Sequence, residues 1–358
     1  MVGNDDDRIS KLPDTLIHHI LSFLPTQEVV RTCLLSKRWK LIWYLVPTIF
    51  FPYSTITYCS EVERKQVIEK FYIYLEKYLE HRKKGMYFID NSVVLTSFKL
   101  EMLVYYKKSK AGVVDKWLAF AVENKVKEIN LTIGEDRDNG GYYYCLPKIL
   151  DNARYLTILQ LYGVELDTSH SFNFPLLKTL SLIRVQSDTG EDDVVFKFLL
   201  CSPSLEKLRL CYYEFLRIGD KSLLQSLSLK FLELTDFSSC KKIRNLSFDD
   251  TSDDLRLSLN ALISNNPLLE NLTLCTDGKI RIESAPELEY FYYGGHMDLS
   301  ISIDISNSLS GKVVICERGY NNGYDGSCNP ERISDLKNSL LWISPSLETL
   351  SINKMQIL

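Results

Sequence analysis

The stretch Asn266–Cys275 reads NPLLENLTLC, in which Leu269, Leu272 and Leu274 follow a proline in the line apolar-x-x-apolar-x-apolar. The last two leucines are two positions apart, which is the period that places side chains on the same face of a β-strand. The same line recurs along most of the chain. It occurs at Leu95–Leu100, Val126–Leu131, Leu156–Leu161, Leu177–Leu182, Leu205–Leu210, Leu224–Leu229, Ile243–Phe248, Leu288–Tyr293 and Leu347–Ile352.

The spacing of these lines identifies a structural repeat. Up to Leu288, successive lines start 19 to 31 residues apart. This period is typical of leucine-rich repeats, in which each repeat adds one parallel strand and the apolar positions face a continuous core. We therefore expect residues 91–358 to form an irregular leucine-rich-repeat α/β solenoid with the shape of an arc. Apolar segments long enough to form helices between the strands are Val114–Val122, Val194–Leu200 and Leu257–Ile263.

The N-terminal part of the chain has helical spacing instead. Pro13 and Pro25 suit helix boundaries, and Thr26 and Ser36 are the expected caps of a second and a third short helix. A bundle this small holds more large apolar side chains than its own interior can bury. These side chains are Leu16, Ile17, Ile20, Leu21 and Leu24 in the first helix, Val29, Val30, Cys33 and Leu34 in the second, and Leu35, Trp39, Ile42 and Trp43 in the third.

Residues 7–51, DRISKLPDTLIHHILSFLPTQEVVRTCLLSKRWKLIWYLVPTIFF, closely resemble the N-terminal F-box of plant F-box proteins. The resemblance implies a three-helix F-box domain over residues 5–52 that docks on a Skp-type adaptor, which hangs from a cullin scaffold in an SCF ubiquitin ligase. Carried over by position, the implied adaptor contacts leave open which residues are interface and which are core of the bundle. They are Leu12, Pro13, Leu16, Ile17, Ile20, Leu24, Pro25, Val30, Leu34 and Trp39.

The resemblance extends to plant F-box proteins with irregular leucine-rich repeats and covers most of the chain, so the expected fold class is α+β overall. Two departures stand out. The asparagine usual three residues after the last strand leucine is replaced by Val185, Tyr213 and Leu232, which predicts a less regular arc. Many relatives also carry a further C-terminal module, whereas this sequence stops just after a repeat line, so we expect a shortened member with a poorly capped last repeat.

Residues 53–90 are expected to link the F-box to the repeats. Val67, Phe71, Leu75 and Tyr78 recur at helical steps and predict a helix over Glu61–Lys84. Its end carries the basic cluster His81–Lys84, which we interpret as a solvated helix end, with a nuclear address as the alternative.

Charge and motifs exclude several function classes. The net charge of -4 argues against nucleic acid as a partner, and no apolar run is long enough for a membrane span. The start of the chain lacks the features of a secretory signal, so we expect the protein in the nucleus or cytoplasm. Nine scattered cysteines predict neither a disulfide framework nor a zinc site, and the common catalytic and nucleotide motifs are absent. We expect no cofactor, no bound metal and no catalytic residue.

Strand alternation predicts a candidate target-binding surface. Residues between and just after the strand leucines, including Ser181 and Cys211, should face away from the core. A group of basic and aromatic residues on that face suits an acidic or phosphorylated peptide of a target protein. In the alternative function, a pocket in the arc binds a small ligand or catalyses a reaction, and the F-box is only regulatory. The candidate target-binding residues are Tyr162, Lys207, Arg209, Tyr212, Tyr213 and Lys230.

Overall fold

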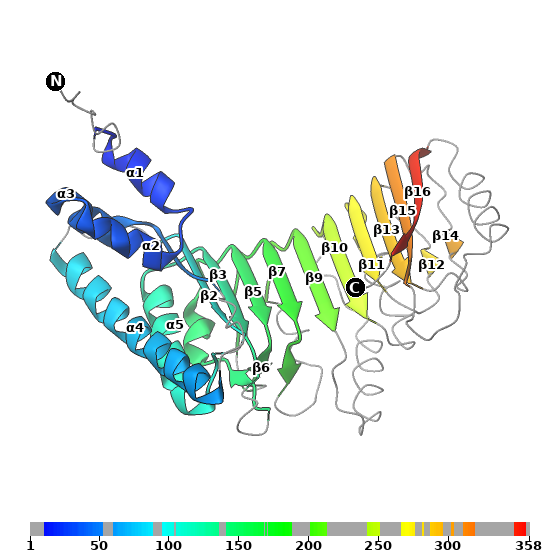
Figure 1. Ribbon diagram of the computed structural model, residues 1–358. Coiled ribbons are helices and arrows are strands. Elements are labelled where there is room, and N and C mark those ends of the chain that lie inside the picture. The colour runs from blue at the N-terminus through cyan, green and yellow to red at the C-terminus, as the bar shows by residue number, and fades with distance from the viewer. Residues whose placement is uncertain are drawn as a thin grey trace. The chain divides into compact units, whose positions relative to one another are not determined.

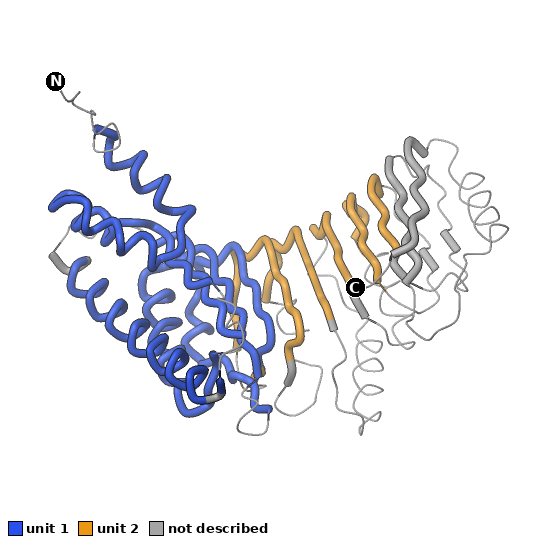
Figure 2. Tube along the Cα trace, in the orientation of Figure 1, with its two compact units in different colours: residues 1–164 blue, residues 165–358 orange. Residues whose placement is uncertain are grey.

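The structure is a computed structural model, and it describes the following parts of the chain: residues 11–52, 60–88, 95–103, 105–135, 141–167, 169, 171–187, 201–212, 242–250, 266–275, 281–282, 287–295, 302–303, 311–318 and 347–355. The chain divides into two compact units, unit 1 with residues 1–164 and unit 2 with residues 165–358 (Figure 2). The boundaries that the sequence suggested after residues 52 and 90 both fall inside unit 1.

Unit 1 begins with the predicted bundle of short helices. Ser36 caps the third helix as expected, because its hydroxyl oxygen accepts a hydrogen bond from the Trp39 N–H at 3.4 Å. The prediction for Thr26 is wrong. Pro25 takes the cap position, and the Thr26 hydroxyl instead accepts from the Phe50 N–H at 2.7 Å. The elements are α1 (Asp14–Leu21), α2 (Thr26–Arg31), η1 (Thr32–Leu34), α3 (Lys37–Ile42), η2 (Trp43–Leu45) and β1 (Thr48–Phe51).

The rest of unit 1 confirms the helices predicted over Glu61–Lys84 and Val114–Val122, which are α4 and α5, and adds a strand that the sequence did not suggest. Strand β1, at the end of the F-box region, pairs in parallel with β2, so the strand order of this unit is β1-β2-β3-β5 (Figure 1). The bundle therefore supplies the first strand of the repeat sheet. The elements are α4 (Glu61–Phe88), β2 (Ser97–Met102), η3 (Lys108–Lys110), α5 (Ala111–Glu123), β3 (Glu128–Ile133), β4 (Tyr144–Cys145), η5 (Lys148–Asn152) and β5 (Ile158–Tyr162).

Unit 2 is a stack of parallel strands in the order β7-β9-β10-β11-β13-β15-β16. Each strand that falls on a predicted repeat line confirms that line. The line Leu224–Leu229 and the helices expected at Val194–Leu200 and Leu257–Ile263 lie outside the described residues. The elements are β6 (Val164–Leu166), which begins at the unit boundary, β7 (Thr179–Ile183), β8 (Gln186–Ser187), β9 (Lys207–Tyr212), β10 (Asn245–Asp250), β11 (Asn271–Cys275), β12 (Arg281–Ile282), β13 (Tyr290–Gly295), β14 (Ser302–Ile303), β15 (Gly311–Arg318) and β16 (Leu347–Met355).

Burial along the strands follows the predicted alternation. In β9, Leu208 and Leu210 are buried while Lys207 and Arg209 are exposed. Two of the residues expected on the open face are buried instead. Cys211 lies at a strand end that the preceding repeat covers, since the Arg184 N–H donates to the Cys211 carbonyl at 3.0 Å. Ser181 is in register with Arg209, and a side chain this small loses solvent access beside a long neighbour.

The turns that lead into the strands hold a contact that the sequence analysis did not foresee. The Asn266 side chain is buried, and its Oδ1 accepts a hydrogen bond from the Ile243 N–H of the preceding repeat at 3.3 Å. The Asn266 carbonyl accepts from the Leu269 N–H at 3.1 Å. An asparagine in front of the proline therefore links two adjacent repeats. None of the helices in the described ranges is long and apolar enough to cross a membrane.

Candidate functional site

The F-box bundle has a small core of its own. Ile17 and Leu21 of α1, Val29 of α2, and Trp39 and Ile42 of α3 are all buried. This burial distinguishes core residues of the bundle from possible interface residues, a distinction that the sequence left open. Ile17 and Trp39, both among the implied adaptor contacts, are core residues of the bundle.

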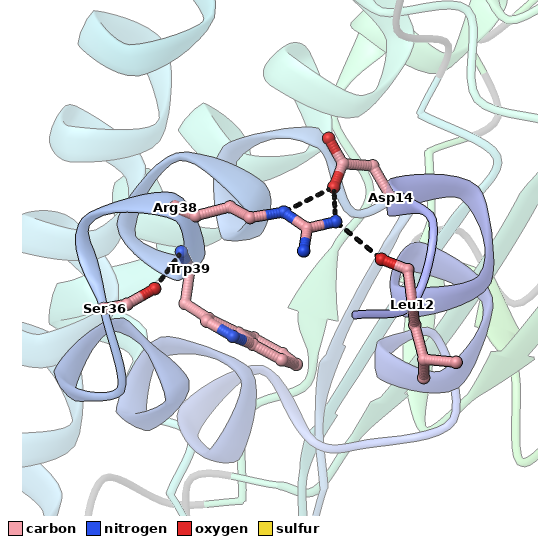
Figure 3. Close-up of polar contacts among 5 residues, drawn as sticks. All are labelled: Leu12, Asp14, Ser36, Arg38 and Trp39. Carbon is pink, nitrogen blue, oxygen red and sulfur yellow. Dashed lines mark hydrogen bonds and ion pairs between the residues drawn. The ribbon is translucent and has the colours of Figure 1, made fainter. Parts of the chain in front are cut away.

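An arginine fixes the start of the bundle. Arg38 at the start of α3 donates from Nε to Asp14 Oδ1 at 2.9 Å and from Nη2 to the Leu12 carbonyl at 2.6 Å, and Nη2 also contacts Asp14 Oδ1 (Figure 3). Both charged side chains are substantially exposed, so the ion pair contributes less than about 1 kcal/mol to stability. Its effect is geometric, because it holds Leu12 and Pro13 in front of α1.

Large apolar side chains of the bundle face outward in spite of that core. Leu16 and Ile20 lie on one face of α1, Phe23 continues their spacing just after the helix ends, and Leu34, after α2, is 89% exposed. An apolar group left in water costs free energy that a docked partner recovers, at about 25 cal/mol per Å² of area covered. We call this set the exposed apolar surface: Leu16, Ile20, Phe23, Leu24, Leu34, Leu35 and Leu41.

The exposed apolar surface overlaps the predicted contacts only in part. Leu16, Ile20, Leu24 and Leu34 belong to both, Pro13 is also exposed, and the three remaining predicted contacts, Leu12, Pro25 and Val30, are half-buried. Sequence reasoning missed Phe23 and Leu41. Phe23 had a usable signal, since it continues the helical spacing of Leu16 and Ile20. The expected place of Leu35 in the third helix is wrong, because this residue precedes α3, and its side chain is exposed.

A buried arginine attaches the bundle to α4. Arg82 is 1% exposed, and it donates from Nη1 to the Trp43 carbonyl at 2.5 Å and from Nη2 to the Val46 carbonyl at 2.6 Å. The interpretation of this residue as part of a solvated helix end is therefore wrong. The loss of water around the charge lowers the pKa of the guanidinium from its ordinary value. Two carbonyls at the end of the bundle thus obtain their donors from the helix that follows it.

Aromatic rings fill the same junction within unit 1. Trp43 packs on Tyr78 of α4 with ring centroids 5.4 Å apart, and Phe51 of β1 meets Trp117 of α5 edge to face at 5.1 Å. The F-box region is thereby packed against both helices that follow it.

The structure brings together only part of the predicted target-binding group. Lys207 and Arg209 are exposed on the same face of β9. Tyr162 is half-buried in β5 of unit 1, and Tyr212 ends β9. Tyr213 and Lys230 lie outside the described residues.

Metal-ligand clusters and cysteine thiols were two kinds of candidate functional group in the described ranges. No group of three or more His, Cys, Asp or Glu side chains there could hold a metal ion. Burial raises the pKa of the thiols of Cys33 and Cys201 above the ordinary value, so both are protonated at neutral pH. A cysteine nucleophile needs the opposite shift.

Two regions of the chain match family models that fit this geometry. Residues 9–50, which span α1 to β1, match the F-box domain, and residues 114–303 match the repeats described as "FBD-associated F-box protein At5g56370, LRR repeats". The second match alone covers more than half of the chain. The protein belongs to the F-box/LRR-repeat family.

Similar proteins of Arabidopsis thaliana are named as F-box proteins, some of them with LRR repeats. This F-box/LRR-repeat protein is 30% identical to F-box/LRR-repeat protein At3g58900 over 69% of its own chain and 71% of the relative. It is 28% identical to F-box protein At3g03040 over 68% of its own chain and 48% of the relative. The chain spans about half the length of most of the curated relatives it matches. The family relationship favours a binding role, generally non-catalytic, for both parts of the chain.

Proposed function

We propose that this protein is the substrate-recognition subunit of an SCF-type ubiquitin ligase in the nucleus or cytoplasm. Its F-box docks on a Skp-type adaptor, which connects it to a cullin scaffold, and its repeats bind the target protein. The chain performs no catalysis itself, because the other subunits of the ligase carry out ubiquitin transfer.

The observation that carries the proposal is the exposed apolar surface. The bundle already buries Ile17, Trp39 and Ile42, and its small interior leaves Leu34 and Phe23 largely in water, where only a partner can cover them. Burial of one such side chain at an interface is worth about 1.5 to 3 kcal/mol. Large side chains that become fully buried carry most of the affinity of protein interfaces. A partner that covers this surface is therefore expected, and the F-box match supports the proposal that it is an adaptor of the Skp type.

The test is adaptor binding by a variant with charges on this surface. In the double variant Leu16→Glu, Leu34→Glu, both substituted side chains are exposed in the free chain, so the fold should persist. We expect its affinity for a Skp-type adaptor, measured by surface plasmon resonance, to fall at least thirtyfold, which corresponds to about 2 kcal/mol.

Leu176→Glu is the matched control, because Leu176 is 51% exposed, close to the 50% of Leu16, and precedes a repeat strand of unit 2. This variant should bind the adaptor like the unmodified protein. If the unmodified protein, the double variant and the control bind the adaptor equally well, the exposed apolar surface is not the adaptor-binding site.

A further inference from the structure

Charged residues occupy two different rows along the strands of unit 2. In the first row, just before each strand, opposite charges pair across neighbouring repeats. Lys178 Nζ lies 2.9 Å from Glu206 Oε1, and Arg244 forms an ion pair with Glu270. In the second row, on the open face of β9, Lys207 and Arg209 have no ion pair with any described residue. The charges of the first row are therefore paired, whereas the two cations of β9 are not paired within the described part of the chain.

The charges on β9 have the same sign and lie on the same face. Residues two apart in a strand are separated by roughly 7 Å, which is within the screening length of physiological salt. Both side chains are exposed, so they repel one another only modestly in the free protein. An anion placed between or over them removes that repulsion and gains two charge-assisted hydrogen bonds.

The register neighbours of the pair carry no charge. Lys207 lies between Thr179 of β7 and Asn245 of β10. Arg209 lies between Ser181 and Ser247 on the same two strands. The amide group of Asn245 is held in place, because Asn271 Nδ2 donates to Asn245 Oδ1 at 2.9 Å. The four residues in register with the pair are thus small and polar, and they can add hydrogen bonds without competing for an anion.

We infer that the open face of β9 binds an extended acidic segment of the target protein, with carboxylates on Lys207 and Arg209. In an extended peptide, side chains two residues apart point the same way at roughly 7 Å, which is the spacing of the two cations. A peptide with Glu or Asp at alternate positions can therefore contact both. This inference rests on the proposed function, because it takes the repeats to be the part that receives the target.

The test is peptide binding by the full chain, measured by fluorescence anisotropy. The probes are a labelled peptide with Glu at alternate positions and the same peptide with every Glu replaced by Gln. We expect the Glu peptide to bind and the Gln peptide to bind at least about tenfold more weakly. The double variant Lys207→Glu, Arg209→Glu should lose at least about tenfold in affinity for the Glu peptide, while Lys207→Arg should keep it.

The matched control changes the net charge by the same amount elsewhere. Lys148 and Arg154 are exposed in unit 1, and Lys148→Glu, Arg154→Glu should retain Glu-peptide binding. An equal loss in this control would mean that only net charge is sensed. The inference is also overturned if the Gln peptide binds as well as the Glu peptide, or if only a phosphoserine version of the peptide or single-stranded DNA binds.

Adaptor binding by the same preparations distinguishes a failure of the acidic-segment inference from a failure of the proposed function. Intact adaptor binding with no preference for the Glu peptide rejects the acidic segment alone. Absence of adaptor binding in the unmodified protein rejects the proposed function, whatever the peptides do.

Discussion

The F-box bundle and the repeat strands differ in how far they expose leucine side chains to solvent. Leu34 of the bundle is 89% exposed, whereas Leu272 and Leu274 of β11 are fully buried. A stacked repeat covers its leucines with the next repeat, but a small bundle has too little interior for all of its apolar residues. The repeats consequently present polar and charged side chains to solvent, while the bundle presents apolar ones.

Because of this difference, the two surfaces gain binding affinity from different interactions. The exposed apolar surface of the bundle gains affinity by removing area from water, which depends little on salt. The cations on β9 gain affinity by charge, which salt screens. Three substitutions test which contacts stabilise the bundle and which stabilise the repeats.

The largest effect is expected where the bundle meets α4. Arg82→Met leaves the Trp43 and Val46 carbonyls without the donors of Arg82 in a buried site, at about 1 to 3 kcal/mol each. We expect the free energy of unfolding in urea to fall by about 4 kcal/mol. Lys84→Met, exposed on the same helix, should change it by less than about 0.5 kcal/mol. If both variants are equally stable, the bundle does not depend on α4.

A smaller effect is expected inside the repeat stack of unit 1. Gly163 follows β5 with φ of 65°, and a Cβ there would lie 2.0 Å from the Ile133 carbonyl oxygen. Gly163→Ala should therefore destabilise the protein by about 2 kcal/mol. Gly112→Ala is the control, because it lies in α5 with open space around it and should stabilise by up to about 1 kcal/mol. Thermal unfolding of the two variants should shift in opposite directions; a shift in the same direction would contradict the close approach.

The smallest effect is expected for the ion pairs between repeats. Glu206→Gln removes the contact with Lys178, and both side chains are partly exposed. The free energy of unfolding should fall by less than about 0.5 kcal/mol. A loss above about 1 kcal/mol in chemical denaturation would show that charge, as well as apolar burial, holds the repeats of unit 2 together.

The repeat strands could be predicted from the sequence because their signal is local. The pattern of Leu269, Leu272 and Leu274 sets both the strand and its buried face within six residues. Strand β1 could not be predicted this way. It has only four residues, and its partner β2 begins at Ser97, far along the chain. Pairing between distant segments leaves little trace in local spacing.

The candidate surface was predictable as a region but not residue by residue. Helical spacing identifies an apolar stripe, yet it does not say which side of a wide stripe the rest of the chain covers. The neighbours Leu16 and Ile17 illustrate this, since one is half in water and the other is buried. The prediction that Arg82 is solvated was wrong for a related reason. Its residue type favours solvent, and only the tertiary position of the Trp43 and Val46 carbonyls accounts for its burial.

The pairing of β1 with β2 limits how such a protein can be recombined. A transplant that ends at residue 52 would carry a strand without its partner, and it would leave behind Arg82, the donor to two carbonyls of the bundle. The segment that can be transferred to another protein is therefore longer than the F-box itself. Within this chain the compact unit that contains those contacts ends at Val164, so a domain swap for targeted protein degradation should be cut there.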